Sequence, residues 1–296
     1  GALGGGNMFQ SNQTVEALGV VSPIFKTYNW LFGLILAAMV GAVIIGGIQR
    51  IASVTSRLVP TMCILYVLSA LFIILSNIGE VPAMFVLIFS EAFSGQAVEG
   101  GILGIAIIGI TRAAFSNEAG IGSAAIAHAA AKTEEPAREG IVAMIGPFID
   151  TIVICTMTAL VVLLTGVYKD PNLQGKGAEM TATAFGSVIP GAEIALAIII
   201  CLFAYSTMIS WEYYGERAWE YLFGSGSLLI FRLLFILFVW IGAVSQLANV
   251  ISFSDLMILS MAVPNIIGGI ILSPLIKEKL QEYWARLQRG EMRRFK

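Results

Sequence analysis

The chain consists of long apolar segments separated by short polar stretches, a pattern typical of helices that cross a membrane. The hydrocarbon core of a bilayer requires about 20 consecutive apolar residues per helix. Uninterrupted apolar segments of about this length occupy residues 30–47, 60–78, 141–167, 192–223, 228–247 and 256–275. The pattern therefore predicts an all-α fold, and specifically a polytopic helical membrane protein.

One further apolar segment, residues 100–132, is interrupted in its middle by the polar sequence SNEAGIGS. Non-helical backbone at membrane depth is tolerated only where it is buried in protein or lines a cavity. A break between half-helices at 101–115 and 121–131 leaves carbonyl groups unpaired at the end of the first and N–H groups unpaired at the start of the second. Many secondary transporters hold substrate and coupling ion at such a break, so we expect a site for a zwitterion or a cation here. For each glycine taken alone, tight helix packing is the alternative.

Polar side chains inside the apolar segments mark further candidates. Arg112 and Glu118 lie in the interrupted segment, and intramembrane ionisable residues usually serve function. For Asp150, in the segment 141–167, we expect a structural partner in preference to a bound ion. Three amides near the start of the chain either line an aqueous path or hold helices together, and these are Gln10, Asn12 and Gln13.

Three stretches are too short or too polar to cross the membrane alone. Residues 1–19 predict the outer half of a helix. Residues 79–99 predict an interfacial helix, and residues 168–190 predict a loop with a short surface helix at 178–189.

One face of the segment 192–223 combines hydroxyl groups with aromatic rings. The residues that share this face by helical spacing are Phe203, Thr207, Ser210 and Tyr214. Hard cations such as sodium take oxygen ligands, and the adjacent hydroxyls of Ser206 and Thr207 offer two. In the alternative, these hydroxyls donate to carbonyl groups of their own helix, which is common in transmembrane helices.

Composition agrees with the membrane class and excludes several others. Hydrophobic residues make up 57% of the 296 residues and charged residues 12%, with a mean hydropathy of +0.86. The net charge of -2 gives no basis for nucleic-acid binding. The three cysteines have no paired spacing, so neither a disulfide framework nor a zinc site is predicted. The chain opens with an apparent half-span and without a secretory signal, from which we expect an N-terminally truncated piece of a longer protein.

The distribution of Lys and Arg predicts the orientation. If the apolar segments alternate across the membrane, thirteen of the seventeen basic residues fall on one side, seven of them in the tail 277–296. Lys26, Lys169 and Lys176 fall on the other side, and Arg112 lies inside the interrupted helix. The positive-inside rule then places the basic amphipathic tail in the cytoplasm and residues 79–99 outside, and we expect a multi-pass protein of the cell inner (plasma) membrane.

Four sequence blocks together resemble the alanine or glycine:cation symporter (sodium:alanine symporter) family. The blocks are GGGNMFQSNQ from Gly4, FSNEAGIGSAAIAHAAAKT from Phe115, GPFIDTIVICTMTALVVLLTG from Gly146 and WEYYGERAWEYLFG from Trp211. The resemblance implies a leucine-transporter-like fold of two inverted five-helix repeats in a single transport domain. It implies that residues 1–78 form the end of the first repeat and residues 100–276 the complete second repeat.

The resemblance also implies a function. A member of this family would import a small neutral amino acid, alanine or glycine, coupled to sodium by alternating access and without an organic cofactor, and we expect a monomer. A proton-coupled symporter and an ion or solute channel remain the alternatives. An enzyme is not predicted, because the single histidine, His128, has no metal-binding partner motif and Ser116 has no evident base, although Asp150 and Glu118 are conceivable acid/base groups. We expect His128 to be a packing or helix-end residue.

Site residues are carried over from the matching motifs only. The implied substrate-site residues are Gln10, Phe115, Asn117, Gly120, Gly122, Thr207 and Trp211, and the implied sodium ligands are Ser206 and Thr207. One position departs from the family pattern: Ser210 precedes Trp211, where a glycine is more usual, and the larger side chain would narrow the pocket.

Overall fold

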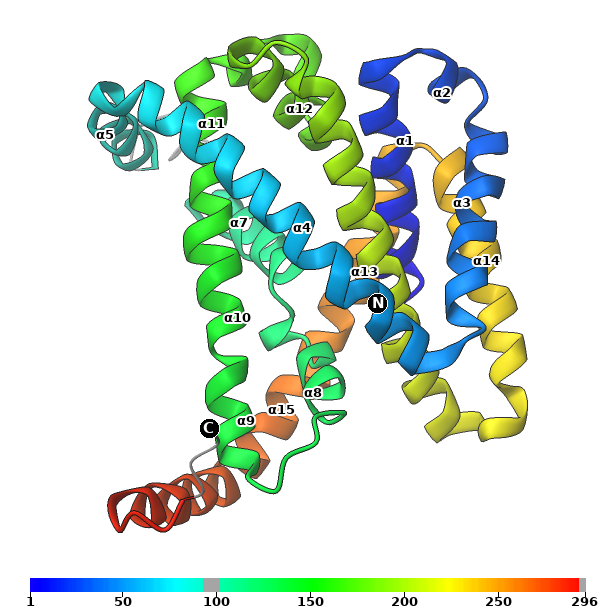
Figure 1. Ribbon diagram of the computed structural model, residues 1–296, viewed down its shortest axis with the longest axis vertical. Helices are drawn as coiled ribbons and strands as arrows, with labels where there is room; N and C mark the ends of the chain where they lie inside the picture. The colour runs from blue at the N-terminus through cyan, green and yellow to red at the C-terminus, as the bar shows by residue number, and fades with distance from the viewer. Residues whose placement is uncertain (93–101, 293–296) are drawn as a thin grey trace.

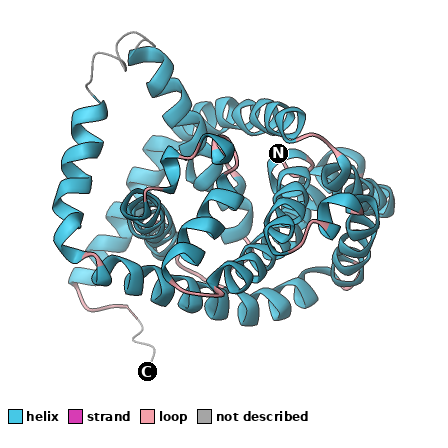
Figure 2. Cartoon of the chain, turned by 90° about the horizontal axis from the view of Figure 1, so that it is seen from above, coloured by secondary structure: helices cyan, strands magenta, loops and turns pink. Residues whose placement is uncertain are grey.

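The computed structural model describes residues 1–92 and 102–292, and every regular element in these ranges is a helix (Figures 1 and 2). The longer helices are α1 (Phe9–Val21), α3 (Asn29–Ile44), α4 (Gly47–Ser76), α7 (Ile102–Ser116), α12 (Gly177–Val188), α13 (Ala192–Phe223), α14 (Leu228–Val244) and α15 (Leu247–Gln288). The shorter ones are α2 (Ile24–Thr27), α5 (Val81–Ala92), α8 (Ser123–His128), α9 (Pro136–Ala143), α10 (Ile145–Pro147) and α11 (Thr156–Thr165). The remaining elements are two π-helical turns and five 3₁₀ turns. The π-helical turns are η1 (Gly4–Met8) and η4 (Phe148–Cys155), and the 3₁₀ turns are η2 (Ile78–Glu80), η3 (Glu118–Gly120), η5 (Val167–Lys169), η6 (Pro171–Leu173) and η7 (Ser225–Ser227).

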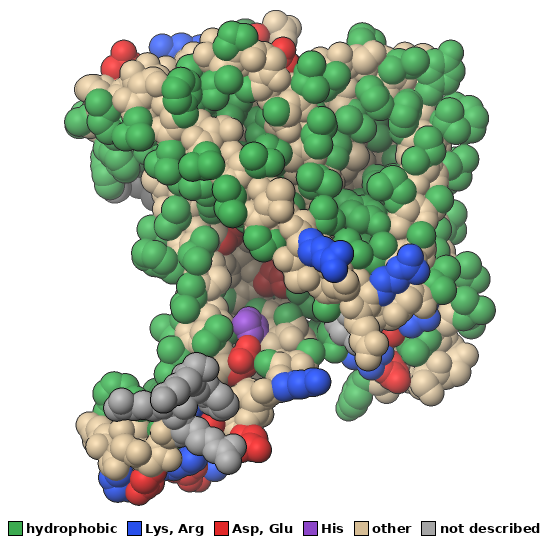
Figure 3. All heavy atoms as spheres, in the orientation of Figure 1, with side chains coloured by type: hydrophobic (Ala, Val, Ile, Leu, Met, Phe, Trp, Pro, Cys, Tyr) green, Lys and Arg blue, Asp and Glu red, His purple; other side chains and the backbone are tan. Residues whose placement is uncertain are grey.

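Within the described ranges, five helical stretches are long and apolar enough to cross a membrane. They are Gln49–Ser76, Pro136–Thr165, Ala192–Phe223, Ser225–Val244 and Leu247–Gln288, and two shorter apolar helices are Asn29–Ile44 and Ala106–Ser116. Large apolar side chains cover the outside of the bundle (Figure 3). The prediction of a helical integral membrane protein is therefore confirmed, and the predicted bounds of α13 match the observed ones.

The predicted start of α4 at residue 60 is wrong, because the helix begins at Gly47 and contains Pro60. Proline removes one backbone donor, to the carbonyl four residues earlier, but a membrane helix tolerates this loss. Thr61 also donates from Oγ1 to the Arg57 carbonyl at 2.9 Å. Arg50 therefore lies inside the helix rather than in a preceding loop.

The boundary predicted between a last span and a separate tail is also wrong. Helix α15 runs without interruption through 42 residues and includes Pro264 and Pro274. Its C-terminal part bends away and runs across the lower end of the molecule (red in Figure 1). The span predicted at residues 141–167 likewise differs at its start, which lies at Pro136.

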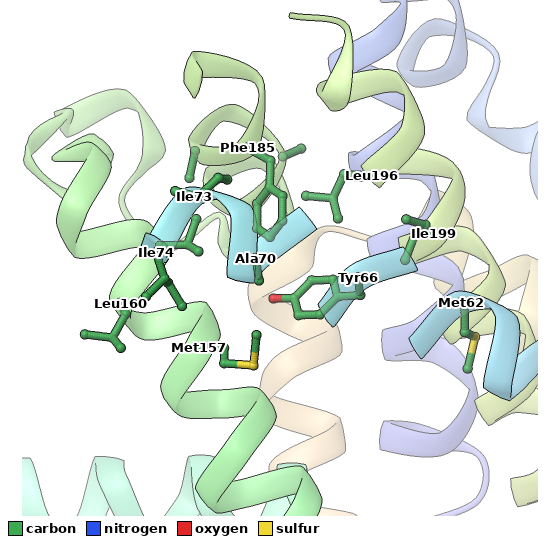
Figure 4. Close-up of a cluster of buried hydrophobic side chains, with 13 residues drawn as sticks. Met62, Tyr66, Ala70, Ile73, Ile74, Met157, Leu160, Phe185, Leu196 and Ile199 are labelled. Atoms are coloured by element: carbon green, nitrogen blue, oxygen red, sulfur yellow. The ribbon is translucent and has the colours of Figure 1, made fainter. Parts of the chain in front are cut away.

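Helix α12, predicted as a short surface helix, packs one face into the hydrophobic core. Its residues Ala182, Ala184 and Phe185 are buried against α4, α11 and α13 (Figure 4). The ring of Phe185 lies 5.4 Å from the ring of Tyr66, measured between centroids. Helix α12 therefore closes one end of the hydrophobic core.

The first helix, η1 followed by α1, lies in the interior of the bundle rather than at its edge. The chain begins near the middle of the bundle's height, and α1 rises from there (Figure 1). Asn7 donates from Nδ2 to the Phe235 carbonyl at 2.8 Å, and Asn12 donates to the carbonyls of Gly242 and Ser245 at 3.1 and 2.9 Å. Asn12 thus holds α1 to α14, which is one of the two roles predicted for it.

Charged groups gather at two opposite ends of the bundle. Lys26 pairs with Glu16 at 2.8 Å and with Glu179 at 3.2 Å beside α2 and α12. Burial lowers the pKa of Lys26, but the hydrogen bonds and charges of the two carboxylates raise it by more, so the net shift is upward. At the other end, Arg286 pairs with Glu135 at 2.8 Å.

The predicted interfacial segment contains the helix α5, none of whose residues is buried. It lies at the side of the bundle against α11 (Figure 1). Residues 93–99 of that segment lie outside the described residues.

Candidate functional site

The predicted helix break is present. Helix α7 ends at Ser116, Asn117 is extended with φ -121° and ψ 124°, and one 3₁₀ turn follows. Gly122 then takes a φ of +92°, in the left-handed region that favours glycine, before α8 begins. Asn117 stabilises the turn, because its Oδ1 accepts a hydrogen bond of 2.9 Å from the Ala119 N–H.

A cavity of about 610 Å³ lies beside this break. Its polar lining comes from the break, from α8, from η4 and from α13, and consists of Ser116, Asn117, Glu118, His128, Asp150 and Tyr214. Figure 3 shows the opening as a recess in which acidic groups and the histidine are visible. The polar residues around the break therefore face a cavity and not only other helices.

Asp150 is positioned by a π-helical turn. The segment η4 has the wider i to i+5 hydrogen-bond pattern, a feature often found at functional sites. The Asp150 Oδ2 accepts a hydrogen bond of 2.7 Å from the Ser116 Oγ at the end of α7. The expected structural partner of Asp150 is thus a residue of the break itself, and both groups line the cavity.

The predicted aromatic residues meet on the other side of the break. Phe115 and Trp211 belong to one apolar cluster together with Ile121 and Ile258. The turn η1 packs flat against this cluster: a Cβ added at Gly6 would overlap the Trp211 side chain, and one added at Gly5 would lie 3.2 Å from Phe115.

Gln10 joins this group through the same turn. Its Nε2 donates to the Gly5 carbonyl at 3.0 Å. Three of the predicted substrate-site residues, Gln10, Phe115 and Trp211, therefore surround η1.

Gly120 and Gly122 are held by a residue that the sequence analysis missed. Asn265 of α15 donates from Nδ2 to the Gly120 carbonyl at 3.0 Å, and its amide packs where a Gly122 side chain would lie. The signal for this residue was an amide next to Pro264 inside an apolar segment.

The hydroxyls of Ser206 and Thr207 both donate to the Phe203 carbonyl at 2.9 Å. Ser206 is buried and faces the Met62 sulfur of α4 at 4.0 Å, and neither hydroxyl lines the cavity beside the break. The alternative of bonding within the same helix is thus observed, and the role of the two oxygens as ion ligands stays a prediction.

Two groups of charged residues link helices near the site. Arg112 pairs through Nη2 with both carboxylate oxygens of Asp255 on α15, and its guanidinium lies 5.1 Å from the centroid of the Phe115 ring. Arg232 of α14 pairs with Glu216 of α13 at 2.7 Å. The sequence indicated Arg112 as a candidate but not its partner Asp255. The sequence alone does not show which acidic residue lies beside an arginine in the folded chain.

His128 acts at a helix end, as expected. Its Nδ1 lies 2.6 Å from the Glu139 Oε1, which connects α8 to α9 at the wall of the cavity.

Apolar helices, one of them interrupted beside a cavity that carries ionisable groups, define a helical integral membrane protein with a candidate site at the interruption. Residues 1–296 match the model of the Sodium:alanine symporter family, and the chain belongs to this family. The family is one of symporters and not of enzymes.

Several curated relatives align along most of the chain. The sodium/alanine symporter AgcS of Methanococcus maripaludis is 40% identical over 284 residues, which cover 95% of this chain and 62% of that protein. The probable sodium/glutamine symporter GlnT of Bacillus subtilis is 34% identical over 97% of this chain and 60% of its own length. A sodium/proton-dependent alanine carrier protein of Bacillus sp. strain PS3 is 33% identical over 95% and 67%. The chain thus spans about three fifths of the length of the first two relatives.

Proposed function

We propose that the protein is a secondary active transporter that imports a small neutral amino acid, alanine or glycine, coupled to sodium by alternating access. The observation that carries the proposal is the break between α7 and α8 beside a cavity with ionisable groups on its wall. The names of relatives as sodium/alanine symporter and sodium/proton-dependent alanine carrier support both the substrate and the ion. We also infer the inverted-repeat arrangement, a monomer and a cytoplasmic tail in the inner membrane.

The ends of the two half-helices would hold the charged groups of the substrate. Carbonyl groups in the last turn of α7 have no partners within the helix and carry partial negative charge, which suits the substrate ammonium group. The Asn117 side chain lines the adjacent cavity. The backbone of Gly120 and Gly122 would stay in place, because Asn265 holds it from α15.

The apolar cluster would select a small side chain. Phe115 and Trp211 already pack against Ile121, Ile258 and the glycine turn η1. Little room remains for extra methylene groups, and overfilling a packed site is unfavourable. Alanine or glycine would therefore bind in preference to leucine.

The hydroxyls of Ser206 and Thr207 would serve as sodium ligands without leaving their present bonds. A hydroxyl that donates its hydrogen still has lone pairs with which its oxygen accepts or coordinates. The bonds to the Phe203 carbonyl fix both oxygens on α13. Sodium binding would then shift the equilibrium between the two gate states of the transporter only if the ion contacts those two states differently.

Counterflow of radiolabelled alanine into proteoliposomes tests the proposal. We expect saturable accumulation that depends on an inward sodium gradient and that unlabelled glycine inhibits. Flux that does not saturate with alanine would support a channel instead.

Proton coupling is the second candidate, because Glu118, Asp150 and His128 line the cavity and a relative is named for both ions. An inward proton gradient without sodium distinguishes it. Accumulation under those conditions would replace sodium by the proton as coupling ion.

A further inference from the structure

A second cavity, of about 410 Å³, lies away from the break between α1, α3, α4 and α13. Its lining is almost entirely carbon and comprises Thr14, Val15, Leu18, Phe32, Ile35, Leu36, Met39, Leu58, Ile198, Cys201, Leu202 and Tyr205. We call it the lateral groove. Its volume is within the range of about 300–1,000 Å³ that is common for ligand pockets.

The lateral groove offers an occupant no free hydroxyl hydrogen. Thr14 donates from Oγ1 to the Gln10 carbonyl at 2.9 Å, and Tyr205 donates from its hydroxyl to the Met39 carbonyl at 2.9 Å. A polar solute would therefore lose its bonds to water without replacement, which is costly. A hydrocarbon chain would lose nothing.

The lateral groove opens on the outside of the bundle. Three side chains of its lining, Ile35, Met39 and Ile198, are each about half exposed, at 48%, 49% and 52%. Ile198 lies on a helix long and apolar enough to cross a membrane, and Ile35 and Met39 lie on the shorter apolar helix Asn29–Ile44. The surroundings of the opening are therefore lipid rather than water.

Two arginines lie at the edge of the lateral groove. Arg57 directly precedes the lining residue Leu58, and Arg50 lies near the start of the same helix. Both belong to α4, seven residues apart and on one face, which corresponds to about 10 Å along the axis. Figure 3 shows Lys or Arg side chains directly beside an apolar hollow on this face.

Neither arginine has an ion pair within the described ranges 1–92 and 102–292. Helices α3 and α4 contain no Asp or Glu that could supply one. By contrast, Arg112, Arg217 and Arg232 all pair with carboxylates. Both side chains are exposed, so this positive charge is available to a negative group from outside the chain.

We propose that the lateral groove, Arg50 and Arg57 form a binding site for an anionic phospholipid of the surrounding membrane. One acyl chain occupies the groove, and the phosphate contacts the two guanidinium groups. Arginine suits phosphate because its planar fork donates two parallel hydrogen bonds. Basic pockets between membrane helices are known places for anionic head groups. The long side chains reach the head-group layer from within the helix.

Native mass spectrometry of the detergent-purified protein tests this site. The probes are phosphatidylglycerol, phosphatidylcholine with the same acyl chains, and glycerol phosphate, which has no acyl chain. The variants are Arg50→Gln with Arg57→Gln, the charge-preserving pair Arg50→Lys with Arg57→Lys, and Ile198→Trp, which fills the groove. Lys132→Gln, an exposed basic residue on the link between α8 and α9, is the matched control.

We expect the unchanged protein to retain phosphatidylglycerol at least tenfold better than phosphatidylcholine. The double glutamine variant should lose this preference, the double lysine variant should keep part of it, and Ile198→Trp should weaken both lipids alike. The control should match the unchanged protein. Circular dichroism of each variant confirms that it is folded.

Two outcomes would overturn the proposal. One is a lipid preference that the double glutamine variant retains, which would place the head group elsewhere. The other is equal competition by glycerol phosphate, which would show that the arginines bind a free phosphate and that the groove has no part in binding.

Discussion

Ser116, the last residue of α7, donates a hydrogen bond of 2.7 Å to Asp150 in the π-helical turn of the neighbouring span. Hydrogen bonds to charged groups stabilise by about 1.5–3 kcal/mol, and we expect about 1 kcal/mol here because this hydrogen bond is exposed. Ser116→Ala should lower the free energy of unfolding by that amount, measured by thermal unfolding of the purified protein. Ser273→Ala is the control, since that hydroxyl bonds within its own helix. Equal effects of the two substitutions would contradict a role for the link.

Thr207 and Ser210 give a matched pair on α13, because each hydroxyl donates at 2.9 Å to the carbonyl four residues earlier. If Thr207 coordinates sodium, Thr207→Ala should raise the sodium concentration for half-maximal alanine uptake by about tenfold, which corresponds to about 1.4 kcal/mol. The alanine concentration for half-maximal uptake should change less. Ser210→Ala should leave the sodium dependence unchanged. If Thr207→Ala raises the half-maximal concentrations of sodium and of alanine equally, Thr207 is not a sodium ligand.

Arg112 and Asp255 connect α7 to α15 through a charged pair within apolar segments. Removing one partner leaves the other charge unpaired. The two single destabilisations together should therefore exceed the destabilisation of the double variant. In a double-mutant cycle of Arg112→Gln and Asp255→Asn, we expect a coupling of about 1–2 kcal/mol in the free energy of unfolding. The exposed pair Lys279 and Glu282, at 2.9 Å, should show a coupling of no more than about 0.5 kcal/mol. Additive single effects at Arg112 and Asp255 would show that the pair contributes nothing.

Asn265 fixes the broken backbone from α15 through its bond to the Gly120 carbonyl. Asn265→Ala should free this turn, so that amide hydrogens of residues 117–123 exchange faster with deuterium. Hydrogen exchange followed by mass spectrometry measures this effect. Asn249→Ala, an exposed amide on the same helix, should leave the exchange of those residues unchanged.

Gly6 lies against the Trp211 side chain with no room for a Cβ. Gly6→Ala should therefore cost about 1–3 kcal/mol through overpacking and should reduce alanine uptake. Gly226→Ala is the comparison, because nothing lies within 4 Å of that position. Thermal unfolding and uptake of both variants provide the measurement, and a tolerated Gly6→Ala would mean that the contact is loose.

Much of the fold could be predicted because apolar length is the main constraint on membrane helices. The bounds of α13 were correct because Gly191 and Gly224, both with positive φ, end the apolar run on each side. The start of α4 and the length of α15 were not predicted, because proline and basic residues need not end a membrane helix: α4 continues through Arg57 and Pro60, and α15 through Pro274 and Lys277.

The candidate site could be predicted only in part. The break at Asn117 was visible as polar residues between two apolar runs, but the π-helical turn at Asp150 has no periodic signal of its own. Asp255 and Asn265 were missed because their partners are more than 140 positions away in the chain. The burial of Gly5 and Gly6 was missed because glycines resemble a loop until the side chains that cover them are known.

The side-chain hydrogen bonds of Asn7 and Asn12, together with the packing of the turn η1 against Trp211, restrict the movement of α1 relative to α13 and α14. Sliding or turning α13 relative to α1 would push the Trp211 indole into the backbone of η1. Separating α1 from α14 would leave the buried side-chain amides of Asn7 and Asn12 without hydrogen-bond partners. We therefore expect α1, α13 and α14 to move together as one rigid body. If the protein opens and closes as proposed, we therefore expect the movement to involve helices outside this group.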